Sequence, residues 1–486
     1  MRQTKLAETL RTLNARERSR WRQYVWSDFC NRHKNLRAFC DLVLAHAPQF
    51  DQSLQKRPAF AQIFGPEEPY HELKFNNLVS DLYELLLDWL ALERHWADPL
   101  EQQRQRTLAL LERHLDRQAA AALERYRALL DRAPQRNAEW HRHAAQLEEA
   151  AETLHSRQPR RADSPHLLRQ AQSTHHAHAL EKLRLAVAMR SRSQLAVIQS
   201  GDNTFLHSDL QAIRADHALL GTLPAASVYF AAHDLLESPS PHTFAALRSA
   251  LDAHHVLFEK DELASLYQCA LNHCIRRINA GQPDAYADAL ALYRTLLERG
   301  LLLKHGGRLS QWTYKNIATA SLRTGAFEWT ERFLHQYRDA LPPTERDNAF
   351  AFNLATLYFE KQALAETLQT LQNVEFTDLT YHVGAKILQL KTFYLLGEDD
   401  ALASLLATTE QLLRRDKTLS PFGKATNLNF LRMLRQASNW KKKKARLSAQ
   451  KAGRERLALL EKIAALQPLA NKDWLLKVLG EESGNL

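Results

Sequence analysis

Residues 311–342 read QWTYKNIATASLRTGAFEWTERFLHQYRDALP, and this stretch decides the fold. Its first half carries one stripe of apolar and small residues at helical spacing, formed by Tyr314, Ile317, Ala318 and Ser321. Its second half carries another, formed by Phe327, Thr330, Leu334 and Tyr337. Thr324-Gly325 separates the two stripes and Pro342 follows the second, so the pattern predicts two short helices packed as a hairpin.

The layout of this hairpin resembles the tetratricopeptide repeat, which has a small residue midway along its first helix, a turn glycine and a closing proline. Such a hairpin cannot bury its apolar face alone, so neighbouring hairpins are expected on both sides. The following pairs are predicted at residues 346–362 with 364–371 and 379–396 with 399–415. Their turns fall at Gly325, Gln362 and Gly397, a spacing of 37 and 35 residues that is close to the 34 of the tetratricopeptide repeat.

The composition favours helix along the whole chain of 486 residues. Apolar residues make up 45% and charged residues 25%, as in a globular protein, while only 14 residues are glycine. No run of 18 apolar residues occurs, and the N-terminus lacks the apolar core of a signal peptide. The four cysteines form no CxxC pair. We therefore predict an all-α, cytoplasmic protein.

Four regions are expected. They are a helical N-terminal cap (1–96), a long-helix region (97–200), tetratricopeptide-like repeats (201–438) and a basic C-terminal helix (439–486). Within the cap, residues 78–92 are apolar nearly all round, which predicts a buried helix. A winged-helix-like unit with helices at 57–64 and 73–90 is the alternative for the cap. In the second region, residues 99–133 and 137–155 each have the pattern of one long amphipathic helix, and a third is expected from 165 to about 199.

Four strings resemble an uncharacterised family of bacterial helical-repeat proteins. They are LYQCALNHCIRRINAG (266–281), ALYRTLLERGLLLKHGGRLSQWTYKNIATASLRTG (291–325), AFNLATLYFEK (351–361) and PLANKDWLLKVL (468–479). The resemblance runs from about residue 20 to the end and is strongest over 225–436. It implies a tetratricopeptide-like α-solenoid and carries no activity, substrate or catalytic residue.

In tetratricopeptide geometry the first helix of each pair lines a concave groove. The side chains expected to be exposed there are Trp312, Lys315, Thr319, Arg323, Phe352, Thr356, Phe359 and Lys391. A basic and aromatic groove of this kind suits an acidic or amphipathic peptide. Thr319 stands where a carboxylate clamp needs Asn, which argues against capture of a free C-terminus. The alternative is that these aromatic residues form the core between repeats.

Both ends of the chain are basic, and the net charge is +10. Residues 1–37 hold ten Lys and Arg, and residues 440–456 hold eight against Glu455 alone. The most basic segment comprises Trp440, Lys441, Lys442, Lys443, Lys444 and Arg446. These cations could neutralise phosphates while Trp440 stacks on a base. The alternative is a solvated helix with Trp440 packed on the last repeat.

The sequence contains no phosphate loop, GxGxxG, HExxH or GxSxG motif of catalysis or cofactor binding. Histidines are frequent between 141 and 178, but no carboxylate ligand stands at fitting spacing beside His175 and His178, and within this stretch a single Glu-x-x-His occurs, at Glu152. No metal or cofactor is therefore expected.

The sequence thus predicts a non-enzymatic scaffold that binds a protein or peptide in a concave groove, with no membrane association. The alternative is a nucleic-acid-associated protein that uses its basic ends, such as a DNA-binding regulator.

Overall fold

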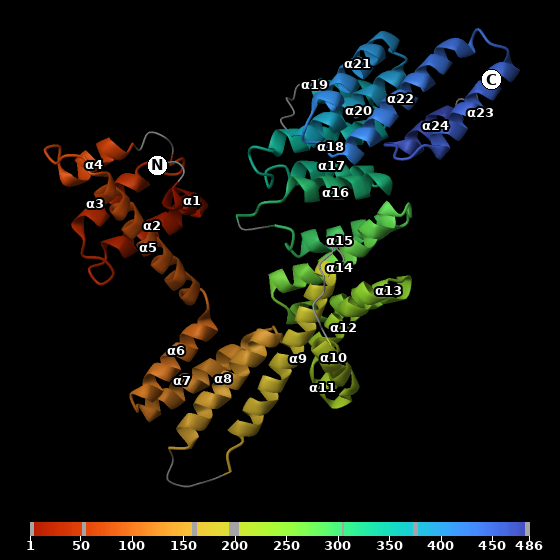
Figure 1. The fold of residues 1–486 in the computed structure, drawn as a ribbon. Coiled ribbons are helices and arrows are strands. Elements are labelled where there is room, and N and C mark those ends of the chain that lie inside the picture. Colours follow the sequence, from red (N-terminus) through yellow and green to blue (C-terminus); the bar gives the residue numbers. More distant parts are fainter. Residues whose placement is uncertain are drawn as a thin grey trace. The chain divides into compact units, whose positions relative to one another are not determined.

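The computed structural model describes residues 4–50, 55–157, 163–193, 204–303, 306–372 and 378–481. In these ranges the regular elements are 24 α-helices and one 3-10 helix (Figure 1). This confirms the predicted all-α class. No helix in these ranges has both the length and the apolar character needed to cross a membrane.

The chain divides into two compact units, Met1–Arg184 with Thr204–Ala226, and Leu185–Asn203 with Ser227–Leu486. The helices that begin in the first unit are α1 (Lys5–Thr12), α2 (Ala15–Trp26), α3 (Lys34–Leu44), α4 (Lys56–Phe64), α5 (Glu72–Trp96), α6 (Pro99–Glu112), α7 (Asp116–Arg132), α8 (Ala138–His155), α9 (His166–Ser193), α10 (Thr204–Ala215), α11 (His217–Thr222) and α12 (Pro224–Glu237). The second unit continues with α13 (Pro241–His254), η1 (His255–Leu257), α14 (Lys260–Asn279), α15 (Ala285–Glu298), α16 (Gln311–Arg323), α17 (Phe327–Gln336), α18 (Arg346–Glu360), α19 (Leu364–Gln372), α20 (Leu379–Leu396), α21 (Asp399–Arg415), α22 (Pro421–Lys444), α23 (Ala449–Ala465) and α24 (Lys472–Glu481).

Helices α1 to α5 enclose one hydrophobic core, and α5 ends at Trp96, where the predicted cap ends. The prediction that α5 is buried all round is wrong. Its fully buried residues form a single stripe, namely Phe75, Leu78, Leu82, Leu86 and Trp89, whereas Leu87 is exposed. No strand occurs among the described residues of the cap, so the wing that a winged-helix unit needs is not found there.

The single long helix predicted at residues 99–133 is in fact two helices, α6 and α7, which pack on each other. The break lies at His114, which has a positive φ of 55°. The N–H of Leu115 donates to the carbonyl of Leu110 at 3.0 Å, which is the hydrogen bond of a helix C-terminal cap. A glycine usually occupies the left-handed position, and because His114 occupies it here, no turn glycine marks the break between the two helices.

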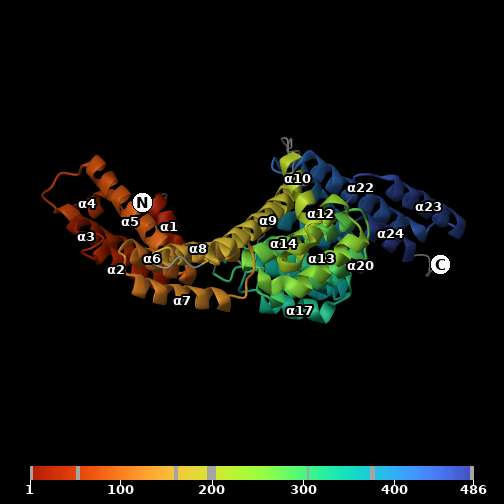
Figure 2. The same ribbon diagram turned by 90° about the horizontal axis from the view of Figure 1, so that it is seen from below.

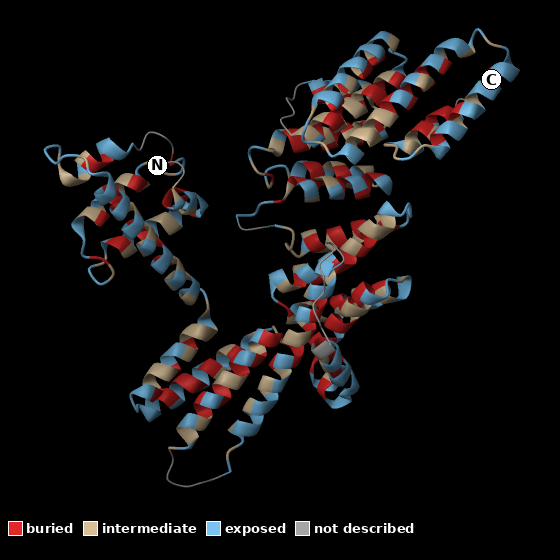
Figure 3. Ribbon diagram, viewed as in Figure 1, coloured by how far each residue is buried: buried red, intermediate tan, exposed pale blue. Residues whose placement is uncertain are grey.

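In the second unit the stripes predicted for residues 311–342 are confirmed where they face the neighbouring helices. Tyr314, Ile317, Ala318 and Ser321 are fully buried in α16, and Thr330 and Leu334 are buried in α17. Two side-chain hydrogen bonds join the pair: the hydroxyl of Tyr314 donates to the carbonyl of Leu334 at 2.7 Å, and Thr330 donates to Ser321 at 2.8 Å. Buried residues line the contacts between neighbouring helices (Figure 3).

The three predicted turn residues share one backbone conformation. Gly325, Gln362 and Gly397 have φ values of 74°, 61° and 75°. At each turn the N–H of the next residue donates to the carbonyl five positions earlier, at 2.9, 2.8 and 3.0 Å. This repeated cap ends one helix and reverses the chain. Accordingly α16 packs on α17 and α18, and α18 packs on α19 and α20.

The predicted boundary at residue 439 is wrong, because it lies inside helix α22. Helices α22, α23 and α24 pack side by side (Figures 1 and 2) and share a core with α20 and α21. The predicted boundary at residue 200 lies outside the described residues.

Candidate functional site

An ammonium group surrounded by aromatic rings lies where α16, α18 and α20 meet. The Nζ of Lys315 is 6.0 Å from the ring centroid of Trp312, 5.3 Å from that of Phe352 and 5.4 Å from that of Tyr381. Trp312 stacks on Tyr381 with centroids 5.7 Å apart, and Phe352 meets Tyr381 edge to face at 5.3 Å. We call these four residues the Lys315 cluster.

A glycine in α20 allows the cluster to close. A Cβ placed on Gly384 would lie 2.9 Å from Cε2 of Phe352, which is closer than such carbons approach. The ring of Phe352 therefore packs directly against the backbone of α20. Glycine within a helix costs roughly 1 kcal/mol relative to alanine, and here the close approach of the ring requires it.

Lys315 has no carboxylate partner among the described residues. Burial lowers the pKa of its amine, while Asp378 acts in the opposite direction without forming an ion pair with it. The Oδ1 of Asp378 instead accepts from the N–H groups of Thr380 and Tyr381 and so caps α20. The aromatic rings compensate only part of the cost of a desolvated cation.

A second lysine, Lys391, lies farther along α20. Its Nζ is 4.5 Å from the ring centroid of Phe359 and 5.1 Å from that of Trp474, which comes from α24. The side chain is only 9% exposed. Burial lowers the pKa of its amine to about 8, while the charge of Glu360 acts in the opposite direction and that of Arg323 in the same direction.

The structure brings the predicted groove residues together in two groups. Trp312, Lys315 and Phe352 meet in one, and Trp312 is 44% exposed. Phe359 and Lys391 meet in the other, but Phe359 is only 3% exposed, because it packs in the core between α18 and α20. The predicted exposure of Phe359 and Lys391 is therefore wrong, whereas Arg323 is exposed at the end of α16.

Sequence reasoning missed Tyr381 and Trp474. Tyr381 lies two residues after the start of α20, and its hydroxyl donates to the carbonyl of Gln311 at 3.2 Å, which ties α20 to α16. Trp474 is 83 residues beyond Lys391 in the sequence. The aromatic pattern alone could have suggested a core role for either residue but not which lysine it meets.

Most side chains of the basic segment 440–446 already contact other parts of the protein. Trp440 is buried and its indole N–H donates to the carbonyl of Ala452 at 3.1 Å, so its ring is not available to a base. Lys441 donates to a backbone carbonyl of α20 at 3.2 Å, and Lys442 lies 3.6 Å from Asp399. Lys444 lies over the Trp440 ring, with Nζ 5.5 Å from its centroid. Lys443 and Arg446 are exposed.

The N-terminal basic residues also have partners. Arg20 forms an ion pair with Glu93 of α5 at 2.6 Å. Arg22 forms one with Asp41 at 2.7 Å, and Arg37 forms one with Asp28 at 2.6 Å. These three arginines thus have carboxylates beside them and contribute little to a phosphate-binding surface.

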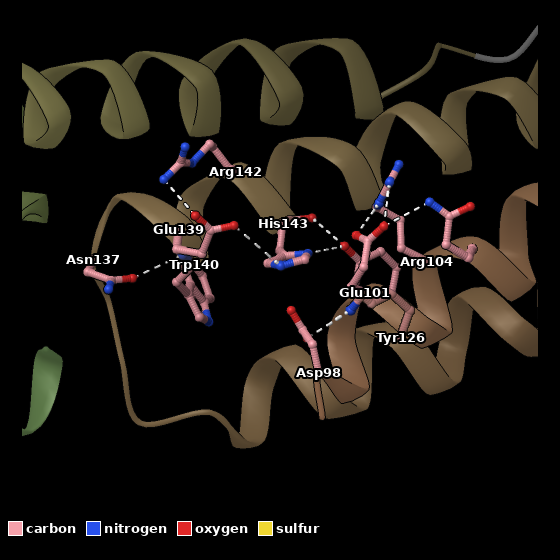
Figure 4. Close-up of polar contacts among 10 residues, drawn as sticks. Asp98, Glu101, Arg104, Tyr126, Asn137, Glu139, Trp140, Arg142 and His143 are labelled. Carbon is pink, nitrogen blue, oxygen red and sulfur yellow. Dashed lines mark hydrogen bonds and ion pairs between the residues drawn. The ribbon is translucent and has the colours of Figure 1, made fainter. Parts of the chain in front are cut away.

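His143 of α8 lies in a polar network rather than in a ligand set (Figure 4). His143 is buried, and its Nδ1 is 2.7 Å from the hydroxyl of Tyr126 on α7. Its Nε2 is 3.7 Å from Glu139, which pairs with Arg142 at 2.6 Å. On α6, Glu101 holds Arg104 through two hydrogen bonds of 2.7 Å.

Among the described residues, the group with atoms close enough to hold a metal is His233, Asp234 and Glu237 on α12. Nδ1 of His233 lies 3.9 Å from Asp234 and 3.7 Å from Glu237. All three come from one helix, and a surface ion-pair arrangement accounts for them.

Comparisons of the chain with protein-family models, with curated proteins and with solved structures find no match in any of the three. The function must therefore be argued from the geometry of the chain itself.

Proposed function

We propose that the chain is a non-enzymatic, cytoplasmic scaffold whose helices α14 to α24 form a tetratricopeptide-like solenoid. In this proposal the face made by α16, α18 and α20 binds an acidic or amphipathic peptide segment of a partner protein. The repeated left-handed turns at Gly325, Gln362 and Gly397 support the solenoid, as does the packing of α16 on α17 and α18 and of α18 on α19 and α20. The resemblance to bacterial helical-repeat proteins agrees with this arrangement.

The observation that carries the proposal is the Lys315 amine. It lies among three rings, is largely desolvated and has no carboxylate partner among the described residues. A buried charge is normally paired, because an unpaired one costs several kcal/mol of desolvation. An aspartate or glutamate of a bound peptide would supply the missing partner.

The neighbouring residues suit such a peptide. Trp312 offers an exposed aromatic surface directly beside the amine, and tryptophan is frequent among the residues that dominate binding energy. Arg323, which is exposed at the end of α16, adds a positive charge near the same face. Acidic groups approaching this face would be attracted before contact.

The test is a charge reversal with a matched control. The variant Lys315→Glu with Arg323→Glu should lose a specific partner from a pull-down out of native lysate treated with nuclease. The control is Arg332→Glu with Arg415→Glu, which reverses two exposed charges on α17 and α21 that have no ion pair among the described residues. The control should retain the partner, and helix content measured by circular dichroism should be equal in both.

Equal retention by the two variants would refute the proposal. If the wild-type protein retrieves only nucleic acid, the alternative of a nucleic-acid-associated protein takes its place. The exposed Lys443 and Arg446 would then be the residues to examine first.

A further inference from the structure

A pocket opens between α7, α8 and α9 in the first unit, and the short segment 222–224 borders it. Its volume is about 530 Å³. Small-molecule sites range from about 300 to 1,000 Å³, so this pocket has room for a ligand the size of a mononucleotide. All its lining residues belong to the first unit, and the peptide-binding face of α16, α18 and α20 belongs to the second.

One wall of the pocket is aromatic. The rings of Trp140 and His141 meet edge to face at 4.9 Å, and those of His141 and His176 at 5.0 Å. Trp140 is fixed in two ways. Its indole N–H donates to the carbonyl of Leu130 at 2.9 Å, and its backbone N–H donates to the side-chain oxygen of Asn137, which caps the helix. Indole and imidazole faces held in this way provide a surface on which a planar ring can stack.

His141 is the buried polar group of this wall. It is only 7% exposed and has no hydrogen-bond partner among the described residues, yet it lines the pocket. Burial and the charges of His176 and Arg136 lower the pKa of His141 to about 4, so its ring is neutral at pH 7. A neutral imidazole has one donor and one acceptor nitrogen, and a ligand atom could satisfy either.

The rim of the pocket is cationic. Arg136 lies 4.3 Å from the centroid of Trp140 and donates to backbone carbonyls at residues 133 and 135. Neither Arg136 nor Arg169 has an ion pair among the described residues. Of the two lining carboxylates, Glu148 is already engaged, with His166 Nδ1 at 2.6 Å, while Asp131 is exposed. Guanidinium groups without carboxylate partners are suited to phosphate, which accepts paired hydrogen bonds from them.

We propose that this pocket binds a mononucleotide, with the base against Trp140, His141 and His176 and the phosphate at Arg136 and Arg169. The site combines a wall of aromatic rings that meet edge to face, one imidazole without a hydrogen-bond partner among the described residues and two lining guanidinium groups without ion pairs there. A bare phosphate would use only the last of these, and a nucleoside only the first two. Both halves of the ligand are therefore needed for full affinity.

The experiment is isothermal titration of the full-length protein with AMP, GMP, CMP and UMP. Three partial ligands, adenosine, ribose 5-phosphate and inorganic phosphate, separate the base from the phosphate. At least one nucleotide should bind with one-to-one stoichiometry and about tenfold more tightly than each partial ligand. No binding of any nucleotide up to about 1 mM would overturn the proposal. Equal binding of nucleotide and inorganic phosphate would also overturn it, because the aromatic wall would then contribute nothing.

Substitutions of the two pocket arginines test where the nucleotide phosphate binds. Arg136→Gln and Arg169→Gln should each weaken nucleotide binding by about tenfold or more, since each removes a charged hydrogen-bond donor. Arg132→Gln is the matched control, because Arg132 is exposed on α7 and does not line the pocket. Unchanged binding in both pocket variants would overturn the assignment.

Photolabelling with the 8-azido derivative of AMP tests the same site without any substitution. The label should be recovered by mass spectrometry on a peptide that contains Trp140 and His141. Recovery only from the basic segment around residue 443 would contradict the proposal.

Discussion

Replacing Lys391 by methionine should stabilise the protein. Lys391 is only 9% exposed, and burial lowers the pKa of its amine from 10.5 to about 8. Each factor of ten in proton affinity corresponds to about 1.36 kcal/mol, so the charged amine costs the folded state roughly 3 kcal/mol at neutral pH. Methionine fills a similar volume, keeps contact with Phe359 and Trp474, and carries no charge.

The effect must also depend on pH with a definite sign. Below pH 8 the amine is charged in both the folded and the unfolded state, and the full cost is present. Between pH 8 and 10.5 the unfolded chain binds more protons at this site than the folded protein, so the contribution of Lys391 to stability rises. The advantage of Lys391→Met should therefore be largest near neutral pH and disappear as pH approaches 10.5.

The assay is thermal or urea unfolding of both proteins across this pH range, read as the difference between variant and wild type. Lys386→Met is the matched control, because Lys386 lies on the same helix and is half-buried. It should change the free energy of unfolding by no more than about 0.5 kcal/mol, as is usual for surface changes. A Lys391→Met protein that is less stable than wild type, or a difference that does not vary with pH, would refute the reasoning.

Three further substitutions test the fold. Gly384→Ala should lower stability by about 1–3 kcal/mol in thermal unfolding, because the new Cβ meets Phe352 at 2.9 Å. The control Gly453→Ala in α23 adds a Cβ that meets nothing within 4 Å, and it should stabilise the protein by up to about 1 kcal/mol. Equal effects of the two substitutions would contradict the close packing at α20. Gln362→Gly should raise the melting temperature slightly, since a φ of 61° costs a non-glycine residue about 1 kcal/mol, and a lower melting temperature would count against this turn. Tyr126→Phe removes the hydroxyl that lies 2.7 Å from Nδ1 of His143, and it should lower the free energy of unfolding in urea by about 1–3 kcal/mol. An unchanged free energy of unfolding would mean that this hydrogen bond is not formed.

The helical hairpin at residues 311–342 could be predicted because its determinants are local. Apolar and small residues at helical spacing, a turn glycine and a closing proline all lie within one hairpin, and the stripes they predict at Ile317 and Leu334 are buried. The break at His114 was not predicted, because no glycine marks the left-handed position there, although histidine is among the non-glycine residues that adopt this conformation more often than most.

The candidate site depends on contacts between distant segments, which helical periodicity does not report. The partners of Lys315 lie 37 and 66 residues farther along the chain, at Phe352 and Tyr381. The sequence left both a packed and a nucleic-acid-contacting role open for Trp440, because both roles have the same helical spacing. Only its burial against α23 distinguishes them.

The most direct test of the central claim is photocrosslinking from the proposed binding face. Trp312 is replaced by p-benzoylphenylalanine, which keeps an aromatic side chain at the exposed edge of the Lys315 cluster, and Arg332 on α17 is replaced in a control protein. We predict that position 312 captures a discrete protein from nuclease-treated lysate, that an excess of an acidic peptide prevents this capture, and that position 332 captures no such protein. Capture of the same proteins from both positions, or capture at 312 that the acidic peptide leaves unchanged, would contradict the account.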